Sequence, residues 1–143
     1  MKKPDRSVED IYPLSPMQQG MLFHGITDSA PGMYVEQVSG WVHGLADAAV
    51  FTRAWQQVVA DGPILRTAFV WEQLHEPHQI VVGEVRLPIE HEDWRQLSAS
   101  EAQAQLRVRL DEERARGFDF GKPPLARLRL MRVGPDFYAF IFT

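Results

Sequence analysis

The sequence contains no cysteine among its 143 residues. This absence excludes disulfides, thiolate metal sites and cysteine nucleophiles, and it is typical of reducing compartments, so we expect a cytoplasmic location. The sequence also lacks any apolar run that approaches the roughly 20 residues of a membrane span. Lys2 and Lys3 are followed by polar residues rather than by the apolar segment of a signal peptide. We therefore expect neither a membrane span nor an export signal.

Basic residues are in the minority, because 15 Lys and Arg stand against 19 Asp and Glu, for a net charge of -4. Nucleic acids and anionic membranes bind basic surfaces, so neither is an expected partner. Internal repeats and low-complexity tracts are also lacking. With 45% hydrophobic residues, a chain of this length is able to bury one compact core.

The apolar pattern and the capping signals predict an α/β protein of the α+β two-layer type, with helices packed on a mixed sheet. Capping boxes mark two helix starts, one at Ser15 with Gln18 and one at Ser98 with Glu101. Residues 1–9 are expected to be a linker or an added leading segment, before a domain over residues 10–143. The predicted helices cover residues 15–26, 46–60 and 98–116, and the predicted strands cover residues 33–42, 65–71, 79–82, 87–92, 125–133 and 137–142.

The last segment, Phe137–Thr143, is apolar at both even and odd positions, which is typical of a central strand. Exposure of three aromatic side chains on one face would cost on the order of 10 kcal/mol, at about 25 cal/mol per Å². We therefore expect an incomplete fold, the front part of a larger domain, whose terminal strand is exposed in this chain. Self-association of two copies is one way to cover such a strand.

Three stretches of the sequence carry motifs in a fixed order. Residues 12–24 read YPLSPMQQGMLFH, residues 63–71 read PILRTAFVW, and residues 117–125 read GFDFGKPPL and lead into the terminal hairpin. In order and spacing they resemble the opening motif, the second motif and the run that leads to the third motif of the nonribosomal peptide synthetase condensation domain. That domain belongs to the chloramphenicol acetyltransferase-like superfamily. The resemblance covers essentially the whole chain.

The resemblance implies that the chain is most of the N-terminal lobe of such a domain. The whole domain forms an amide bond when the amine of an acceptor aminoacyl thioester attacks a donor acyl thioester. Each substrate is held on the phosphopantetheine arm of a peptidyl carrier protein. The family's His-His-x-x-x-Asp-Gly motif directly follows the strand that corresponds to Phe137–Thr143, and it is absent here. The resemblance thus implies no catalytic residue and no directly bound cofactor in this chain, with carrier proteins and the remainder of the domain as partners.

The second motif supplies Arg66, Thr67 and Phe69 as candidate site residues. For Arg66 the resemblance implies a salt bridge to the aspartate of the absent His motif, and no partner is expected within this chain. A solvent-facing arginine on a strand is the alternative. Ser15 and Gln18 border the substrate channel in the family, although helix capping accounts for both residues equally well.

Two positions depart from the family pattern. The pair Asp61 and Gly62 stands where members commonly carry Arg-His, and Gly20 stands where many members carry Arg. The role of the Arg-His pair is therefore in doubt here. The opening motif in this form resembles the subgroup that accepts a donor ending in a D-residue, but the sequence does not give the amino acids that are joined.

Other titratable residues suggest weaker hypotheses. His24 and Asp28 have the His-x-x-x-Asp spacing of superfamily acyltransferases, but Ser29 follows instead of Gly, so a helix-end histidine favoured by the dipole is preferred. The charged helix over residues 98–116 is expected to present a solvated face with i,i+4 pairs, with carrier docking as the alternative. The remaining histidines are His43, His75, His78 and His91. They have no third metal ligand nearby in the sequence, so we assign no metal site.

Two functions from different classes remain open. The first is a piece of an amide-forming condensation domain that has no activity alone. The second is a naturally truncated, non-catalytic module that docks carrier proteins.

Overall fold

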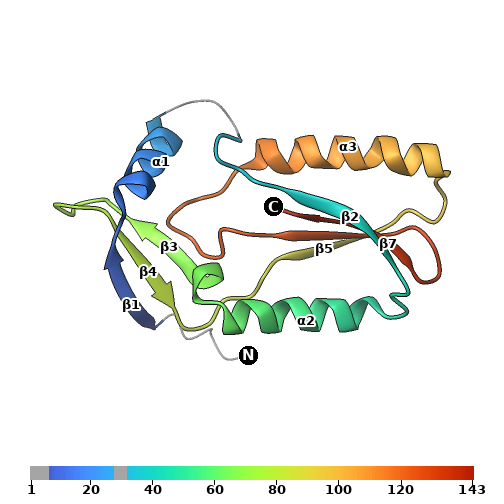
Figure 1. The fold of residues 1–143 in the computed structure, drawn as a ribbon, viewed down its shortest axis with the longest axis horizontal. Helices are drawn as coiled ribbons and strands as arrows, with labels where there is room; N and C mark the ends of the chain where they lie inside the picture. Colours follow the sequence, from blue (N-terminus) through green and yellow to red (C-terminus); the bar gives the residue numbers. More distant parts are fainter. Residues whose placement is uncertain (1–6, 28–31) are drawn as a thin grey trace.

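The computed structural model describes residues 7–27 and 32–143. They form two sheets with three α-helices (Figure 1). The helices are α1 (Pro16–Thr27), α2 (Ala48–Asp61) and α3 (Ala99–Arg116), with a 3-10 helix, η1, at Pro63–Arg66. The strands are β1 (Val8–Pro13), β2 (Val38–His43), β3 (Thr67–Val70), β4 (His78–Val82), β5 (Ile89–Asp93), β6 (Leu128–Arg132) and β7 (Phe137–Phe142). No helix within the described ranges is both long and apolar enough to cross a membrane.

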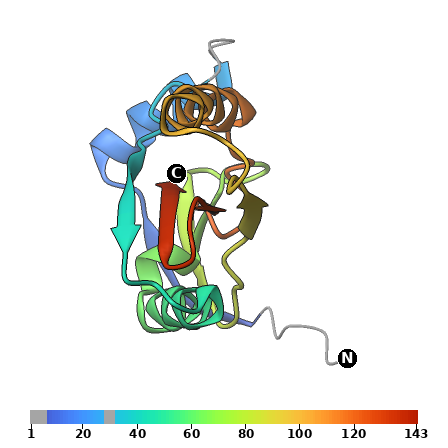
Figure 2. The ribbon, with the colours of Figure 1, turned by 90° about the vertical axis from the view of Figure 1, so that its right-hand side faces the viewer.

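The four-stranded sheet has the order β2-β7-β6-β5 and is mixed, because β5 pairs parallel to β6 while the other pairs are antiparallel. Helix α3 covers one face and α2 covers the other, as Figure 2 shows from the end. The predicted mixed sheet under helices is confirmed. Helices on both faces, however, make three layers here rather than two.

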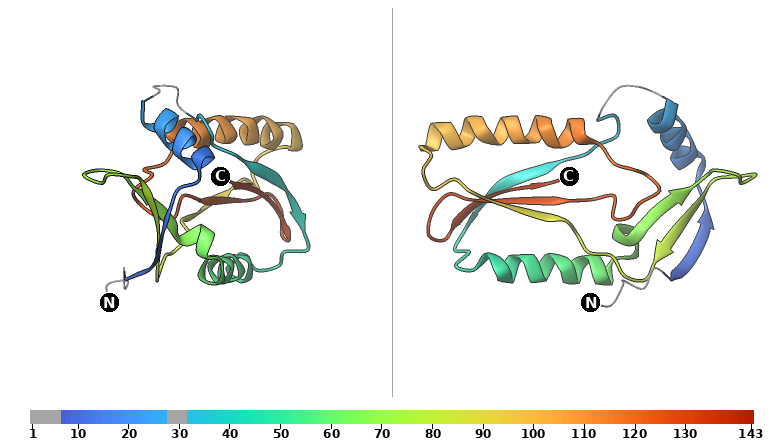
Figure 3. Two further views of the ribbon diagram at one scale, coloured as in Figure 1. Left: turned by 60° about the vertical axis from the view of Figure 1, so that its left-hand side comes forward. Right: turned by 180° about the vertical axis from the view of Figure 1, so that it is seen from behind.

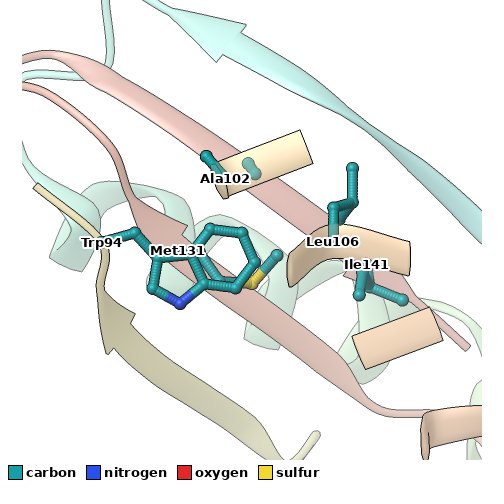
Figure 4. Packing of buried hydrophobic residues seen from close by; sticks show 6 residues of the cluster. Trp94, Ala102, Leu106, Met131 and Ile141 are labelled. Carbon is teal, nitrogen blue, oxygen red and sulfur yellow. The ribbon is translucent and has the colours of Figure 1, made fainter. Parts of the chain in front are cut away.

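Alternate side chains of β7 divide between two hydrophobic clusters. Ala139 and Ile141 pack with Trp94, Met131 and residues of α3 (Figure 4). Phe140 and Phe142 belong to the cluster on the α2 side, where the Phe142 ring stacks on Trp55 at 4.8 Å between centroids. The prediction of a central strand with two apolar faces is therefore confirmed.

The expectation that the terminal strand is exposed is wrong. β7 pairs with β2 along one edge and with β6 along the other, and Ile141 is 1% exposed. Segments outside this chain were expected to cover the strand, whereas α2 and α3 of the same chain cover it. Because β7 is covered, the structure gives no support to the expectation that two copies associate through it.

A separate three-stranded antiparallel sheet, ordered β1-β4-β3, lies with α1 at the end of the molecule away from the β6–β7 turn (Figure 3). Its strand β1 begins at Val8, inside the segment predicted as a linker, so the secondary structure predicted for residues 8 and 9 is wrong. All six residues of β1 are exposed, so burial left no pattern to find. Residues 1–6 lie outside the described ranges.

Local signals placed the helices well. Ser98 and Glu101 form the predicted capping box of α3, and the side chain of Asp47 accepts a hydrogen bond from the backbone of Ala49 at the start of α2. The predicted β3–β4 and β6–β7 hairpins and the edge position of β5 are also confirmed. The strand expected over residues 33–42 begins later, at Val38.

Candidate functional site

The opening motif forms the start of α1 and its attachment to the three-stranded sheet. The Ser15 Oγ atom accepts a hydrogen bond from the backbone of Gln18 at 3.2 Å, and the Gln18 Oε1 atom accepts one from the backbone of Ser15 at 2.9 Å. The predicted capping box is therefore present. The Gln18 amide also meets the Gln79 amide of β4 at 3.3 Å, so the same side chain joins helix and sheet.

The second motif forms η1 and β3 rather than one continuous strand. The Thr67 hydroxyl donates to the Pro63 carbonyl at 2.9 Å, which closes η1. The Phe69 backbone N–H donates to the Phe120 carbonyl at 2.8 Å and so joins β3 to the third motif stretch. Arg66 lies at the end of η1 and is 7% exposed. The alternative of a solvent-facing arginine is therefore wrong.

Arg66 also has a partner within the chain, contrary to expectation. Its Nη1 atom lies 2.7 Å from the Glu9 Oε2 atom, and it donates to the carbonyls of Val82 and Gly83. The Arg66 Nε atom is buried without a hydrogen-bond partner in the described part of the chain. Glu9 could not be found from the sequence because it lies 57 positions away, in a segment without a strand pattern.

The third motif stretch packs against α1. The ring of Phe120 lies so close to the α1 backbone that a Cβ atom on Gly25 would approach it to 2.7 Å. A larger residue at position 25 would therefore require the Phe120 ring to shift. The Arg127 guanidinium lies over the Phe118 ring at 4.2 Å from the centroid. These contacts fix the loop between α3 and β6.

All three motif stretches converge on one cavity of about 540 Å³. The opening motif contributes Gln18 and Met21, the second contributes Phe69, and the third contributes Phe120. Thr143, at the end of β7, also lines the cavity, and the C-terminus lies where the four-stranded sheet faces α1 and the smaller sheet (Figure 1). The remaining lining residues are mostly apolar and include Leu22, Met33, Leu65, Phe118, Leu125 and Phe142.

The lining of this cavity carries little acid–base chemistry. Its titratable side chains, within the described residues, are Tyr34 and Glu36. Both are exposed, and neither is a histidine or an activated nucleophile. The cavity therefore supplies mainly shape and apolar contact.

Gln37 contacts Thr143, one of the residues that line this cavity. Its Nε2 atom donates to the Leu110 carbonyl at 3.0 Å and to the Thr143 hydroxyl at 3.4 Å, while its Oε1 atom accepts from Arg114 at 3.3 Å. One amide thus joins the end of α3 to the end of β7. Gln37 was not predicted from the sequence, because no motif marks it.

An ionic cluster lies between α3 and strands β5 and β6, where a solvated helix face was predicted. Glu113 is 3% exposed and pairs with Arg127 and Arg129, so this prediction is wrong for Glu113. Burial would raise the pKa of the Glu113 carboxyl, but hydrogen bonds from the two arginines outweigh it and lower that pKa. A signal was present, because Glu113 lies seven residues after Leu106 on the inward stripe of the helix.

Glu92 on β5 extends the same cluster. It accepts hydrogen bonds from Arg109 and Arg129 and from the Trp94 indole at 2.9 Å. Burial opposes ionisation of Glu92, yet these hydrogen bonds lower its pKa to about 2. The cluster keeps every charge paired and lies on the α3 side of the sheet, so we assign it to stability.

The other histidine hypotheses gain little from the structure. His24 lies in the last turn of α1, and Asp28 lies outside the described residues. His43 stacks on Phe137 with 4.0 Å between centroids, and His78 contacts the Glu76 carbonyl at 2.9 Å. No group of three or more potential metal ligands gathers in residues 7–27 and 32–143.

Comparison with known proteins identifies the family. The family model of the condensation domain matches residues 8–143. A linear gramicidin synthase protein of Brevibacillus parabrevis is 42% identical over 139 residues, which is 97% of this chain and 2% of that protein. Bacitracin synthase 3 of Bacillus licheniformis is 32% identical over 143 residues, which is 100% of this chain and 2% of that protein. The chain thus spans a small part of these synthetases.

Solved structures agree in fold. A four-domain nonribosomal peptide synthetase bound to AMP and glycine superposes with a TM-score of 0.79 at 22% identity, over 99% of this chain and 10% of that one. The first condensation domain of the calcium-dependent antibiotic synthetase also gives 0.79, at 18% identity, over 95% of this chain and 34% of that one. The resemblance inferred from the three motif stretches is confirmed, and the chain belongs to the condensation domain family.

Proposed function

We propose that this chain forms the N-terminal part of a condensation domain that joins two substrates held on carrier proteins. In that reaction the acceptor amine attacks the carbonyl carbon of the donor thioester. The new C–N amide bond forms, the C–S bond breaks, and the donor's phosphopantetheine arm leaves as a thiol while the amine loses a proton. The observation that carries the proposal is the convergence of all three motif stretches on one cavity at the end of β7.

The residues that line this cavity are suited mainly to positioning the substrates. The cavity is apolar, and its titratable lining residues are Tyr34 and Glu36. Such a wall favours an aligned encounter of two tethered groups, which is a large part of what this reaction requires. The group that accepts or orients the amine proton belongs, by the resemblance, to the His motif that follows β7 in the family. Thr143 lines the cavity, so a segment continuing from it would start there.

Arg66 supports the same assignment. Arg66 is 7% exposed and its Nε atom has no acceptor in the described part of the chain, which is costly for a buried charged group. The resemblance supplies an acceptor, namely the aspartate of the His motif. Arg66 would then tie the catalytic loop to η1 and β3, as a positioning residue.

The proposed partners follow from the reaction. They are two peptidyl carrier proteins, whose phosphopantetheine arms bring the substrates, and the remainder of the condensation domain. The chain itself is proposed to bind no cofactor directly. The lack of cysteine supports a cytoplasmic location.

The test is an amide-forming assay with two loaded carrier proteins, followed by mass spectrometry of the tethered product. We expect no product with the 143-residue chain and a product with the condensation domain that contains it. Product formed by the chain alone would refute the assignment of the chemistry to another segment. Tight carrier binding without product from either protein would favour the docking hypothesis instead.

A further inference from the structure

Within residues 7–27 and 32–143, the hydrogen bonds of the Arg66 side chain are made by its Nη1 atom. That atom faces the Glu9 Oε2 atom at 2.7 Å, the Val82 carbonyl, and the Gly83 carbonyl at 3.3 Å. Both carbonyls lie at the end of β4, because Val82 is its last residue and Gly83 follows it. The Nε atom on the other edge of the same guanidinium is buried and has no partner in the described residues. One edge of this side chain is therefore fixed by hydrogen bonds, and the Nε atom on the other edge lacks an acceptor among the described residues.

Glu9 owes its place to an irregularity in β1. The register between β1 and β4 shifts at this point, with Val8 opposite Val82 and Asp10 opposite Val81, so Glu9 is the extra residue of a bulge. Bulges of this kind redirect a side chain and occur near active sites. Here the bulged residue supplies the carboxylate that contacts Arg66.

The two charged partners of this contact differ in their exposure to solvent. The side chain of Arg66 is 8% exposed and that of Glu9 is 48% exposed. A half-exposed carboxylate gains little from an ion pair by itself, whereas a buried guanidinium loses much when its countercharge is removed. Glu9 is the carboxylate that neutralises Arg66 within residues 7–27 and 32–143. The main effect of the Glu9 carboxylate is therefore to orient the Arg66 side chain.

We propose that Glu9 is a positioning residue for the condensation reaction, acting through Arg66. Its carboxylate holds the Nη1 edge of Arg66, so that the Nε edge stays turned toward an acceptor supplied by the remainder of the domain. This inference rests on the proposed function. It assigns a role to a residue that none of the three motif stretches includes.

The experiment uses the intact condensation domain with two loaded carrier proteins and measures kcat and KM for amide formation. We expect Glu9→Ala to lower kcat about tenfold or more while each KM stays within about twofold, because a displaced positioning group affects chemistry rather than carrier binding. Glu9→Gln keeps the shape and an acceptor oxygen, and is expected to retain more kcat than Glu9→Ala. Asp10→Ala on the same strand removes the same charge and is the matched control, with kcat unchanged.

A double-mutant comparison separates positioning from general stability. If Glu9 acts through Arg66, Glu9→Ala lowers kcat in the wild-type background and adds nothing in the Arg66→Ala background. Melting followed by circular dichroism identifies a variant that fails to fold, and Glu9→Gln then carries the test. Unchanged kcat in both Glu9 variants, or a further loss in the Arg66→Ala background, would overturn the role of Glu9. A wild-type domain that forms no amide would instead refute the proposed function itself.

Discussion

The strongest stability prediction concerns the buried carboxylate of Glu113. Its two oxygens accept hydrogen bonds from Arg127 and Arg129, whose side chains are 9% and 14% exposed. Glu113→Ala would leave both guanidinium groups buried without this acceptor. Removing one partner of a buried ion pair typically costs about 3 to 5 kcal/mol. At about 3 to 4 °C per kcal/mol for a chain of this size, the melting temperature should fall by about 10 to 20 °C.

The neighbouring Glu112 provides a matched control. Its side chain is 54% exposed and pairs with Arg109 three residues earlier, on the same helix. Glu112→Ala makes the same change of residue and of charge, but an exposed pair contributes only about 0 to 1 kcal/mol. Urea unfolding followed by circular dichroism compares the two free energies of unfolding. A difference below about 1 kcal/mol between the variants would refute the reasoning that burial decides the cost of Glu113→Ala.

Three further predictions concern pH, a helix cap and the core. The pKa of Glu92 is lowered from 4.5 to about 2, so its ionised side chain stabilises the fold above pH 4.5 and this stabilisation is lost as the pH falls towards 2. Glu92→Gln should remove this contribution, which is roughly 3 kcal/mol in total. The free energy of unfolding in urea should therefore depend less on pH in that window. Ser98→Ala removes the cap of α3 and should cost about 1 kcal/mol in the same assay, while Ser98→Asp should restore most of it. Met131 is fully buried against α3, so Met131→Ala should cost about 2 to 5 kcal/mol, and a cost below about 1 kcal/mol would contradict the packing in Figure 4.

Much of the local structure followed from neighbouring residues in the sequence. The capping boxes at Ser15 and Ser98 depend on contacts across three residues, so the sequence states them directly. The two-sided apolar pattern of Phe137–Phe142 likewise required a central strand. The motif stretches were found for the same reason, since each is continuous in the chain.

The contacts that bring distant segments together were not predictable in this way. Glu9 meets Arg66 through a bulge whose position depends on the pairing with β4. Glu113 appeared to belong to a solvated helix face because its arginine partners lie 14 and 16 residues later, just before and within β6. Each such contact depends on how the chain packs, because packing sets the distance between two side chains and their separation in the sequence does not.

The sequence alone determined the family, the helices and the central position of the last strand, because each rests on residues close together in the chain. Only the tertiary structure decided that α2 and α3 cover this strand and that the three motif stretches line one cavity. The physical reason is that burial and ion pairing depend on which surfaces meet. Those surfaces come from segments tens of residues apart, and their meeting is settled by the packing of the whole chain.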